Sequence, residues 1–118
     1  TIQYDEILIG NSLKQPNDEY YVMIYDDEDY DTNLYGTYLN LYGQKEDAIR
    51  VYTSQLNNPI NQNFKADKSN LDVDNISDLK VKSSTLLKIK DGKIEDFYEG
   101  EKLVDYLKEI SKTEETDE

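Results

Sequence analysis

The chain of 118 residues contains no cysteine and no histidine. Without cysteine it can form no disulfide and can perform no thiol chemistry, because the thiolate is the reactive species in such chemistry. The usual pairs of a catalytic nucleophile and its base are also missing. We therefore expect no enzymatic activity, assign no catalytic residue and expect no cofactor.

Long apolar runs are missing as well. No stretch approaches the ~20 apolar residues that a membrane-spanning helix needs, so we expect no membrane insertion within this chain. Apolar residues make up 36% of the sequence, and 118 residues suffice for one core. We expect a single domain over residues 1–111. Residues 112–118 contain no apolar side chain and are expected to form a disordered acidic tail.

Positive charge is scarce, because 13 basic residues face 26 acidic ones and the net charge is −13. Binding of nucleic acid relies on Lys and Arg side chains that neutralise phosphates, so nucleic acid is not expected as a partner. Anionic membranes are disfavoured for the same reason. The charge favours a protein partner, in particular a basic one, or a cation.

The composition also bears on the source and the location of the protein. Twelve lysines against one arginine, with two alanines, indicate an AT-rich genome, which is typical of low-GC Gram-positive bacteria. The chain begins at Thr1 without a signal-peptide pattern, so we expect that an N-terminal segment was removed. An extracytoplasmic or surface-anchored location follows if that segment was an export signal; a cytoplasmic location is the alternative. The oligomeric state stays open.

Apolar spacing and local signals predict the elements of the first half. Residues 4–12 are expected to form a helix, and a second helix is expected to begin near Thr32, with Asp31 or Thr32 as its N-cap and Gly43 just beyond its end. Runs rich in β-branched and aromatic residues predict strands over residues 20–25 and 49–54. The second helix carries one wide apolar stripe, expected to face the core: Leu34, Tyr35, Tyr38, Leu39 and Tyr42.

The second half begins with a polar stretch over residues 57–78, in which we expect one short helix or two turns, near residues 60–64 and 76–79. Residues 85–90 and 93–98 flank Asp91-Gly92, a strong signal for a two-residue hairpin. A last helix is expected over residues 101–111. The order of these elements predicts an α/β sandwich around a four-stranded mixed sheet.

The second half resembles a known family. Residues 84–93 read STLLKIKDGK, and they are followed by FYEG at residues 97–100 and by a helix. This succession is similar to the second half of a thioredoxin, and the first half shares the β-α-β order of that superfamily. The resemblance implies a thioredoxin-like three-layer sandwich, related to the thioredoxin-like or glutaredoxin-like proteins of low-GC Gram-positive bacteria.

The chain departs from this family where the redox chemistry would take place. The Cys-x-x-Cys of the superfamily would fall near residues 29–32, where no cysteine is present. The cis-proline would fall on Ser84, and a non-proline cis bond costs ~2.5–4 kcal/mol, so we expect a trans bond between Ser83 and Ser84. The resemblance therefore implies a thioredoxin-like fold without thioredoxin activity.

Five carboxylates within six residues form the densest feature of the sequence: Asp26, Asp27, Glu28, Asp29 and Asp31. One interpretation is that they cap the helix that follows. Another is a calcium loop, because Asp27, Asp29 and Asp31 have its alternating spacing. However, Thr32 stands where the loop needs glycine and Tyr38 where it needs glutamate, so the EF-hand pattern fails and we assign no metal ligand.

These observations lead to a functional hypothesis. The chain is expected to be a redox-inactive, thioredoxin-like module that binds another protein or serves as an accessory domain. The binding surface would be the former active-site edge, made of the segment 26–31 and the loop over residues 81–84. Its candidate binding residues are the five carboxylates at 26–29 and 31, with Ser83 and Ser84. The alternatives are a cation-binding (Ca²⁺) domain that uses residues 26–31, and an acidic mimic of nucleic acid.

Overall fold

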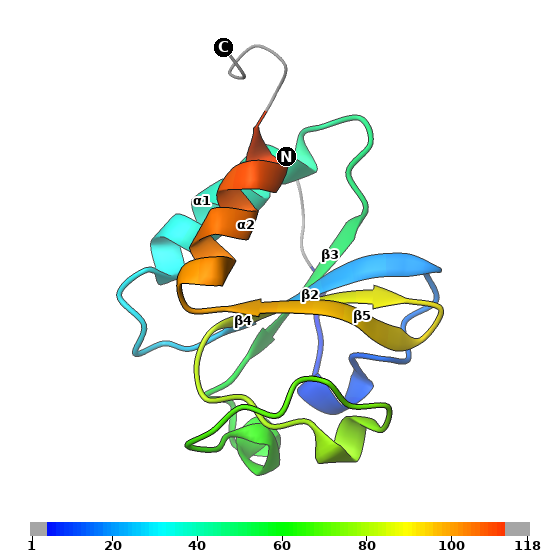
Figure 1. Cartoon of the computed structure of the whole chain (residues 1–118), viewed down its shortest axis with the longest axis vertical. Coiled ribbons are helices and arrows are strands. Elements are labelled where there is room, and N and C mark those ends of the chain that lie inside the picture. The colour runs from blue at the N-terminus through cyan, green and yellow to red at the C-terminus, as the bar shows by residue number, and fades with distance from the viewer. Residues whose placement is uncertain (1–4, 113–118) are drawn as a thin grey trace.

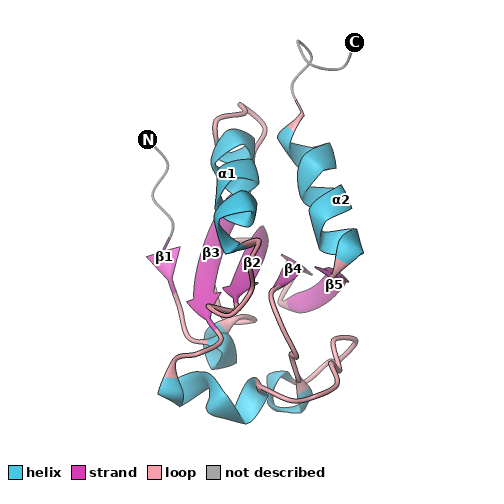
Figure 2. Ribbon diagram, turned by 90° about the vertical axis from the view of Figure 1, so that its left-hand side faces the viewer, coloured by secondary structure: helices cyan, strands magenta, loops and turns pink. Residues whose placement is uncertain are grey.

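The computed structural model describes residues 5–112 and shows three layers. Two α-helices lie on one face of a central sheet, and three short 3₁₀ helices with their connecting loops lie on the other face (Figures 1 and 2). The predicted α/β sandwich is therefore confirmed. The tail predicted over residues 112–118 lies, except for Lys112, outside the described residues.

The four long strands are those that the sequence predicted: β2 (Glu19–Tyr25), β3 (Arg50–Gln55), β4 (Thr85–Lys90) and β5 (Lys93–Glu99). They lie in the order β3-β2-β4-β5. β2 runs parallel to β3 and antiparallel to β4, which places it in the centre of the sheet. The loops that follow β2 and β3 therefore emerge at the end of the sheet where β4 begins.

The predicted helix over residues 4–12 is wrong. The chain instead forms the two-residue strand β1 (Asp5–Glu6), which pairs in parallel with β3 and adds a short fifth strand to the sheet, and then the 3₁₀ helix η1 (Ile9–Asn11). The backbone N–H of Ile7 donates to the carbonyl of Thr53 at 2.7 Å. Pairing with the free side of β3 thus replaces the local helical hydrogen bonds. Tyr4, where the predicted helix began, is outside the described residues.

Helices α1 (Thr32–Gly43) and α2 (Glu101–Ser111) pack side by side on the sheet (Figure 2). The Lys45 amine donates to the carbonyl of Ile110 at 3.0 Å and so ties the end of α1 to the end of α2. Gly43 is the last residue of α1 and not the expected residue beyond its end, because Gln44 continues in a right-handed helical conformation, which needs no glycine. Neither helix in residues 5–112 is long and apolar enough to cross a membrane.

Both faces of β2 are buried, as its uninterrupted apolar sequence predicts. Tyr20, Val22 and Ile24 pack toward the 3₁₀ layer, and Tyr21 and Met23 pack toward the helices. The helical side holds a group of tyrosines in which the Tyr21 ring contacts Tyr42 of α1 and Tyr106 of α2 edge to face. These large rings let a chain with few apolar residues fill a core on each side of its sheet.

The β4–β5 turn confirms the prediction from Asp91-Gly92. Asp91 has a φ of 53° and Gly92 a φ of 77°, the two positive values that a type I′ turn requires. The polar stretch forms η2 (Pro59–Phe64) and η3 (Ile76–Asp78), where turns or a short helix were expected. The buried Asn61 fixes η2 by accepting from the Ile9 N–H at 3.0 Å and donating to the Gln55 carbonyl at 2.7 Å.

Candidate functional site

The structure brings together the two segments that the sequence singled out, the acidic loop (residues 26–31) and the 81–84 loop. The acidic loop follows β2 and the 81–84 loop precedes β4. The backbone N–H of Asp26 donates to Oγ of Ser84 at 3.0 Å, and both residues are buried. This hydrogen bond joins the two loops into one continuous edge of the molecule, where β2 ends and β4 begins. No peptide bond among the described residues is cis, so the predicted trans bond before Ser84 is confirmed.

A third segment joins this edge. The backbone N–H of Asp27 donates to Oδ1 of Asn57 at 2.7 Å. Asn57 follows β3, whose parallel pairing with β2 continues as a bond from the Leu56 N–H to the Tyr25 carbonyl at 2.8 Å. Asn57 was not among the residues that the sequence pattern indicated. Its position just after the second parallel strand was the available signal, because the carboxyl ends of parallel strands meet at one edge.

The five carboxylates of the acidic loop are not equivalent. Asp26 is buried, and its Oδ1 accepts from the N–H of Glu28 at 3.0 Å. Asp29 is half-buried, and it accepts from the N–H of Asp31 and from the hydroxyl of Tyr35, at 3.0 and 3.1 Å. Asp27, Glu28 and Asp31 are exposed. Two acidic side chains thus shape the loop, and three remain on the surface for a partner.

The expected helix cap takes a different form. Asp31 occupies the N-cap position of α1 but makes no side-chain capping hydrogen bond. The Thr32 hydroxyl instead contacts the carbonyls of Asp26 and Asp29 at 3.0 and 2.9 Å, which closes the loop on itself. Burial raises the pKa of Tyr35, and the neighbouring Asp29 carboxylate raises it further. Asp29, Thr32 and Tyr35 thus fix the part of the loop that leads into α1, in addition to the bonds to Ser84 and Asn57.

The geometry gives no support to the calcium loop. Within residues 5–112, no group of three or more Asp or Glu side chains is arranged to hold a metal ion. Asp29, the middle residue of the alternating pattern, is already bonded to Tyr35 and to the backbone of Asp31. The alternating spacing therefore does not translate into convergent carboxylates.

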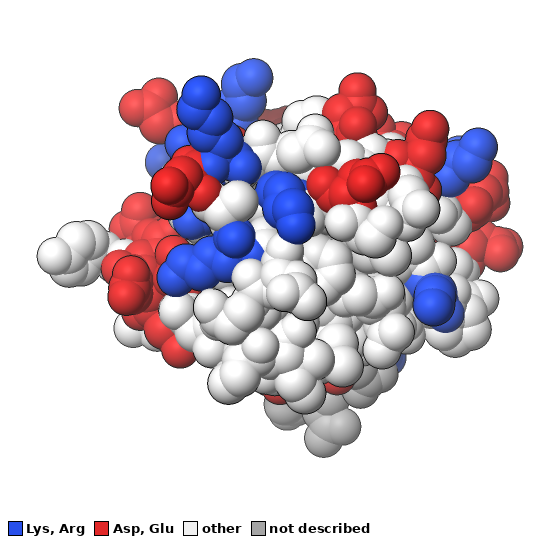
Figure 3. All heavy atoms as spheres, turned by 90° about the horizontal axis from the view of Figure 1, so that it is seen from below, with Lys and Arg blue, Asp and Glu red and all other residues white. Residues whose placement is uncertain are grey.

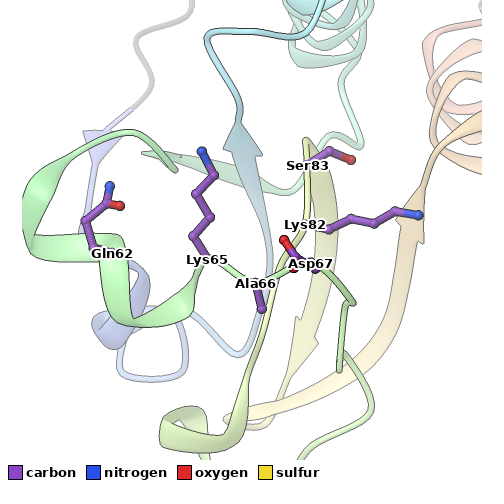
Figure 4. A pocket seen from close by; sticks show the side chains of 6 residues that line it. All are labelled: Gln62, Lys65, Ala66, Asp67, Lys82 and Ser83. Atoms are coloured by element: carbon purple, nitrogen blue, oxygen red, sulfur yellow. The ribbon is translucent and has the colours of Figure 1, made fainter.

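A hollow of about 500 Å³ lies next to the 81–84 loop, on the 3₁₀ side of the molecule. It is lined by Gln62, Lys65, Ala66, Asp67, Lys82 and Ser83. Its floor is held by a short bridge in which the N–H of Val81 donates to the Phe64 carbonyl at 2.7 Å. The Lys65 and Lys82 side chains run in different directions from this floor, so the hollow does not gather their two amines at one point (Figure 4).

Charge is distributed unevenly over the molecule. Residues 57–84 contain four lysines and four aspartates, so the net charge of −13 belongs to the rest of the chain. Seen from below, the 3₁₀ side presents a broad uncharged area, and basic and acidic side chains lie together along its upper-left border (Figure 3). The acidic loop thus borders a neutral region on the side of the 81–84 loop. A partner that approaches this edge meets its negative charge mainly on the acidic loop.

The comparisons with known proteins assign no family. No protein-family model and no curated protein sequence matches the chain.

Proposed function

We propose that the chain is a thioredoxin-like domain without redox chemistry, and that it acts as a protein-interaction or accessory module. Its chain order supports the fold assignment: β2-α1-β3 is a β-α-β unit, and β4-β5-α2 is a hairpin followed by a terminal helix. The absence of cysteine removes the thiolate that every thioredoxin reaction needs.

The observation that carries the proposal is the hydrogen bond from Asp26 to Ser84. By the resemblance to thioredoxin, the acidic loop occupies the position of the superfamily's cysteines. Ser84 occupies the position of its cis-proline. Here these two places are held side by side without either functional group. Such an edge would contact another polypeptide, and its three exposed carboxylates would make that contact selective for positive charge.

Two measurements test this function. The purified protein should reduce insulin disulfides in the presence of dithiothreitol no faster than the uncatalysed background. A photoreactive residue in place of Asp27 or of Ser83 should crosslink to one and the same protein in the cells that produce this chain. Lys90, at the opposite end of β4 from Ser84, is the matched control position. Equal crosslinking from Lys90, or different proteins from Asp27 and Ser83, would refute an interaction edge at these loops.

A further inference from the structure

The outer face of α1 carries two exposed leucines and no charged residue. Among the residues of the structure, five large hydrophobic side chains are exposed: Tyr30, Leu34, Leu41, Ile60 and Phe97. Leu34 and Leu41 are 37% and 44% exposed, and they lie two helical turns apart, so they share one face of α1. Tyr30, which is fully exposed, comes four residues before Leu34. Three of the five exposed hydrophobic residues therefore lie on α1 or in the loop just before it.

The lack of charge on this helix is as informative as its leucines. Residues 32–43 contain no Asp, Glu, Lys or Arg, although charged residues make up 33% of the chain. The remaining exposed positions of α1 are occupied by Asn33, Thr37 and Asn40. A helix face that only meets water is ordinarily polar and charged, whereas the buried centre of a protein interface is depleted of charge.

We propose that this face, the α1 face (Tyr30, Leu34, Thr37 and Leu41), binds an amphipathic helix of a partner protein, whose basic end lies against the acidic loop. The proposal extends the proposed function and rests on it, because Asp27 and Glu28 of the interaction edge serve both. Apolar side chains of the partner would cover Leu34 and Leu41. Its Lys or Arg side chains would meet the exposed carboxylates that precede the helix.

Charge selects this occupant over a second copy of the chain. A helix of 12 residues is about 18 Å long and about 10 Å wide, so the α1 face offers roughly 200 Å². A stable interface needs about 800 Å² on each partner. Any occupant that met α1 alone would fall short of this area, so the contact has to include the acidic loop. Two copies of the chain would each bring a charge of −13 to such a contact. A basic helix would instead add electrostatic attraction to the small apolar contact.

The test is a titration of the ¹⁵N-labelled protein with a synthetic peptide of about four helical turns. The peptide is built from Leu and Lys, with Leu at positions i, i+3, i+4 and i+7 and Lys elsewhere. Two control peptides carry Glu in place of Lys, or the same residues with Leu spread around the helix. We expect amide shifts over residues 27–41 with the first peptide alone, and an affinity that falls as salt is raised.

Variants separate the α1 face from general attraction to an acidic protein. The double variant Leu34→Asn, Leu41→Asn should lower the affinity by about tenfold, as expected for the loss of central apolar contacts. The matched control is Ile60→Asn, because Ile60 is 66% exposed and belongs to η2 on the other side of the sheet. It should bind like the unmodified protein. The pair Asp27→Asn, Glu28→Gln should weaken binding and flatten its salt dependence.

The outcomes distinguish this inference from the function on which it rests. Equal affinity of the Leu34→Asn, Leu41→Asn variant and the Ile60→Asn control overturns the inference. Shifts confined to the acidic loop and the 81–84 loop also overturn it, yet they leave the proposed interaction edge in place. If sedimentation shows a dimer that the two asparagine substitutions dissociate, the occupant is a second copy and the inference is wrong.

Discussion

α1 and α2 cover the same face of the sheet and differ by one residue in length, but their outer faces have opposite compositions. The exposed positions of α2 carry charged side chains: Glu101, Lys102, Asp105, Lys108 and Glu109. α1 carries no charged residue and exposes Leu34 and Leu41. Both helices bury equivalent inner faces, so packing against the sheet does not explain the difference. α2 has the charged outer face of a helix that meets only water, whereas the uncharged outer face of α1 is the one for which we propose a partner.

The two helices also begin differently. α2 follows β5 through the single residue Gly100, whose φ of 63° and ψ of −136° favour glycine. α1 follows the acidic loop, which is held by side chains from two other segments, Ser84 and Asn57. The start of α1 is therefore positioned by tertiary hydrogen bonds, and the start of α2 by backbone conformation. Such external support is what a binding edge requires.

The inner faces of the two helices should be equally important for stability. Leu39 of α1 and Leu107 of α2 are both fully buried in the same core. We expect Leu39→Ala and Leu107→Ala each to lower the free energy of unfolding by about 2–5 kcal/mol, as measured by urea denaturation. The exposed Leu41→Ala is the control for α1. If Leu39→Ala lowered the free energy of unfolding no more than Leu41→Ala, α1 would be loosely packed. The inner faces of the two helices would then not be equally important for stability.

The different starts of the helices predict two different mechanisms of destabilisation. Ser84→Ala leaves the buried N–H of Asp26 without its acceptor and should cost about 1–3 kcal/mol. Gly100→Ala should cost about 1–3 kcal/mol through backbone strain alone, because nothing lies within 4 Å of the added Cβ. Ser83→Ala, beside Ser84, is the control and should leave the urea midpoint nearly unchanged. If Ser84→Ala had the same urea midpoint as Ser83→Ala, the hydrogen bond from Asp26 to Ser84 would not stabilise the fold.

Tyrosines near both helices should make the fold sensitive to alkaline pH. Burial raises the pKa of Tyr35 and of Tyr98, and hydrogen bonds to Asp29 and Asp96 support both shifts. The folded protein keeps these protons where the unfolded chain loses them, so stability should be constant below pH ~10 and fall above it. Urea midpoints measured from about pH 8 to about pH 11, on both sides of the ordinary tyrosine pKa of about 10, test this. Tyr35→Phe should make the decline less steep, and an unchanged slope would contradict the assignment to Tyr35.

The smallest effect is expected on the outer faces. Leu41→Lys on α1 and Lys108→Leu on α2 exchange the two compositions at exposed positions. Each should change the free energy of unfolding by less than about 0.5 kcal/mol, which thermal denaturation can resolve. This result would mean that the exposed leucines of α1 do not serve the stability of the isolated domain. A large destabilisation by Leu41→Lys would instead give Leu41 a structural role and weaken the case for a docking face.

Local signals were sufficient for much of the fold. The apolar run of β2, the Asp91-Gly92 turn and the apolar face of α2 each specify a conformation within a few residues, and the structure confirms them. The resemblance to thioredoxin also predicted that the acidic loop and Ser84 share one edge, and the structure does place the end of β2 beside the start of β4. The thioredoxin-like assignment itself remains a proposal.

Features that depend on contacts between residues far apart in the sequence could not be predicted from local patterns. Residues 5 and 6 pair with β3 although their neighbourhood has helical spacing. The apolar stripe of α1 did not reveal the rotation of the helix, which turns Leu34 to solvent while Tyr35 and Leu39 are buried. Asp26 is buried because a serine 58 positions away in the sequence accepts its N–H. In each case a tertiary contact outweighs the local pattern.

Photo-crosslinking from the two helices, in the cells that make the protein, tests most directly whether α1 is the binding side. The photoreactive residue replaces Asn40 on the outer face of α1 or Lys108 on the outer face of α2, both of which are exposed. We predict that Asn40 gives an adduct with the same protein that is captured from Asp27, and that Lys108 gives none. Adducts of equal yield from both helices, or an adduct from Lys108 alone, would contradict the assignment of α1 and the acidic loop as the interaction surface.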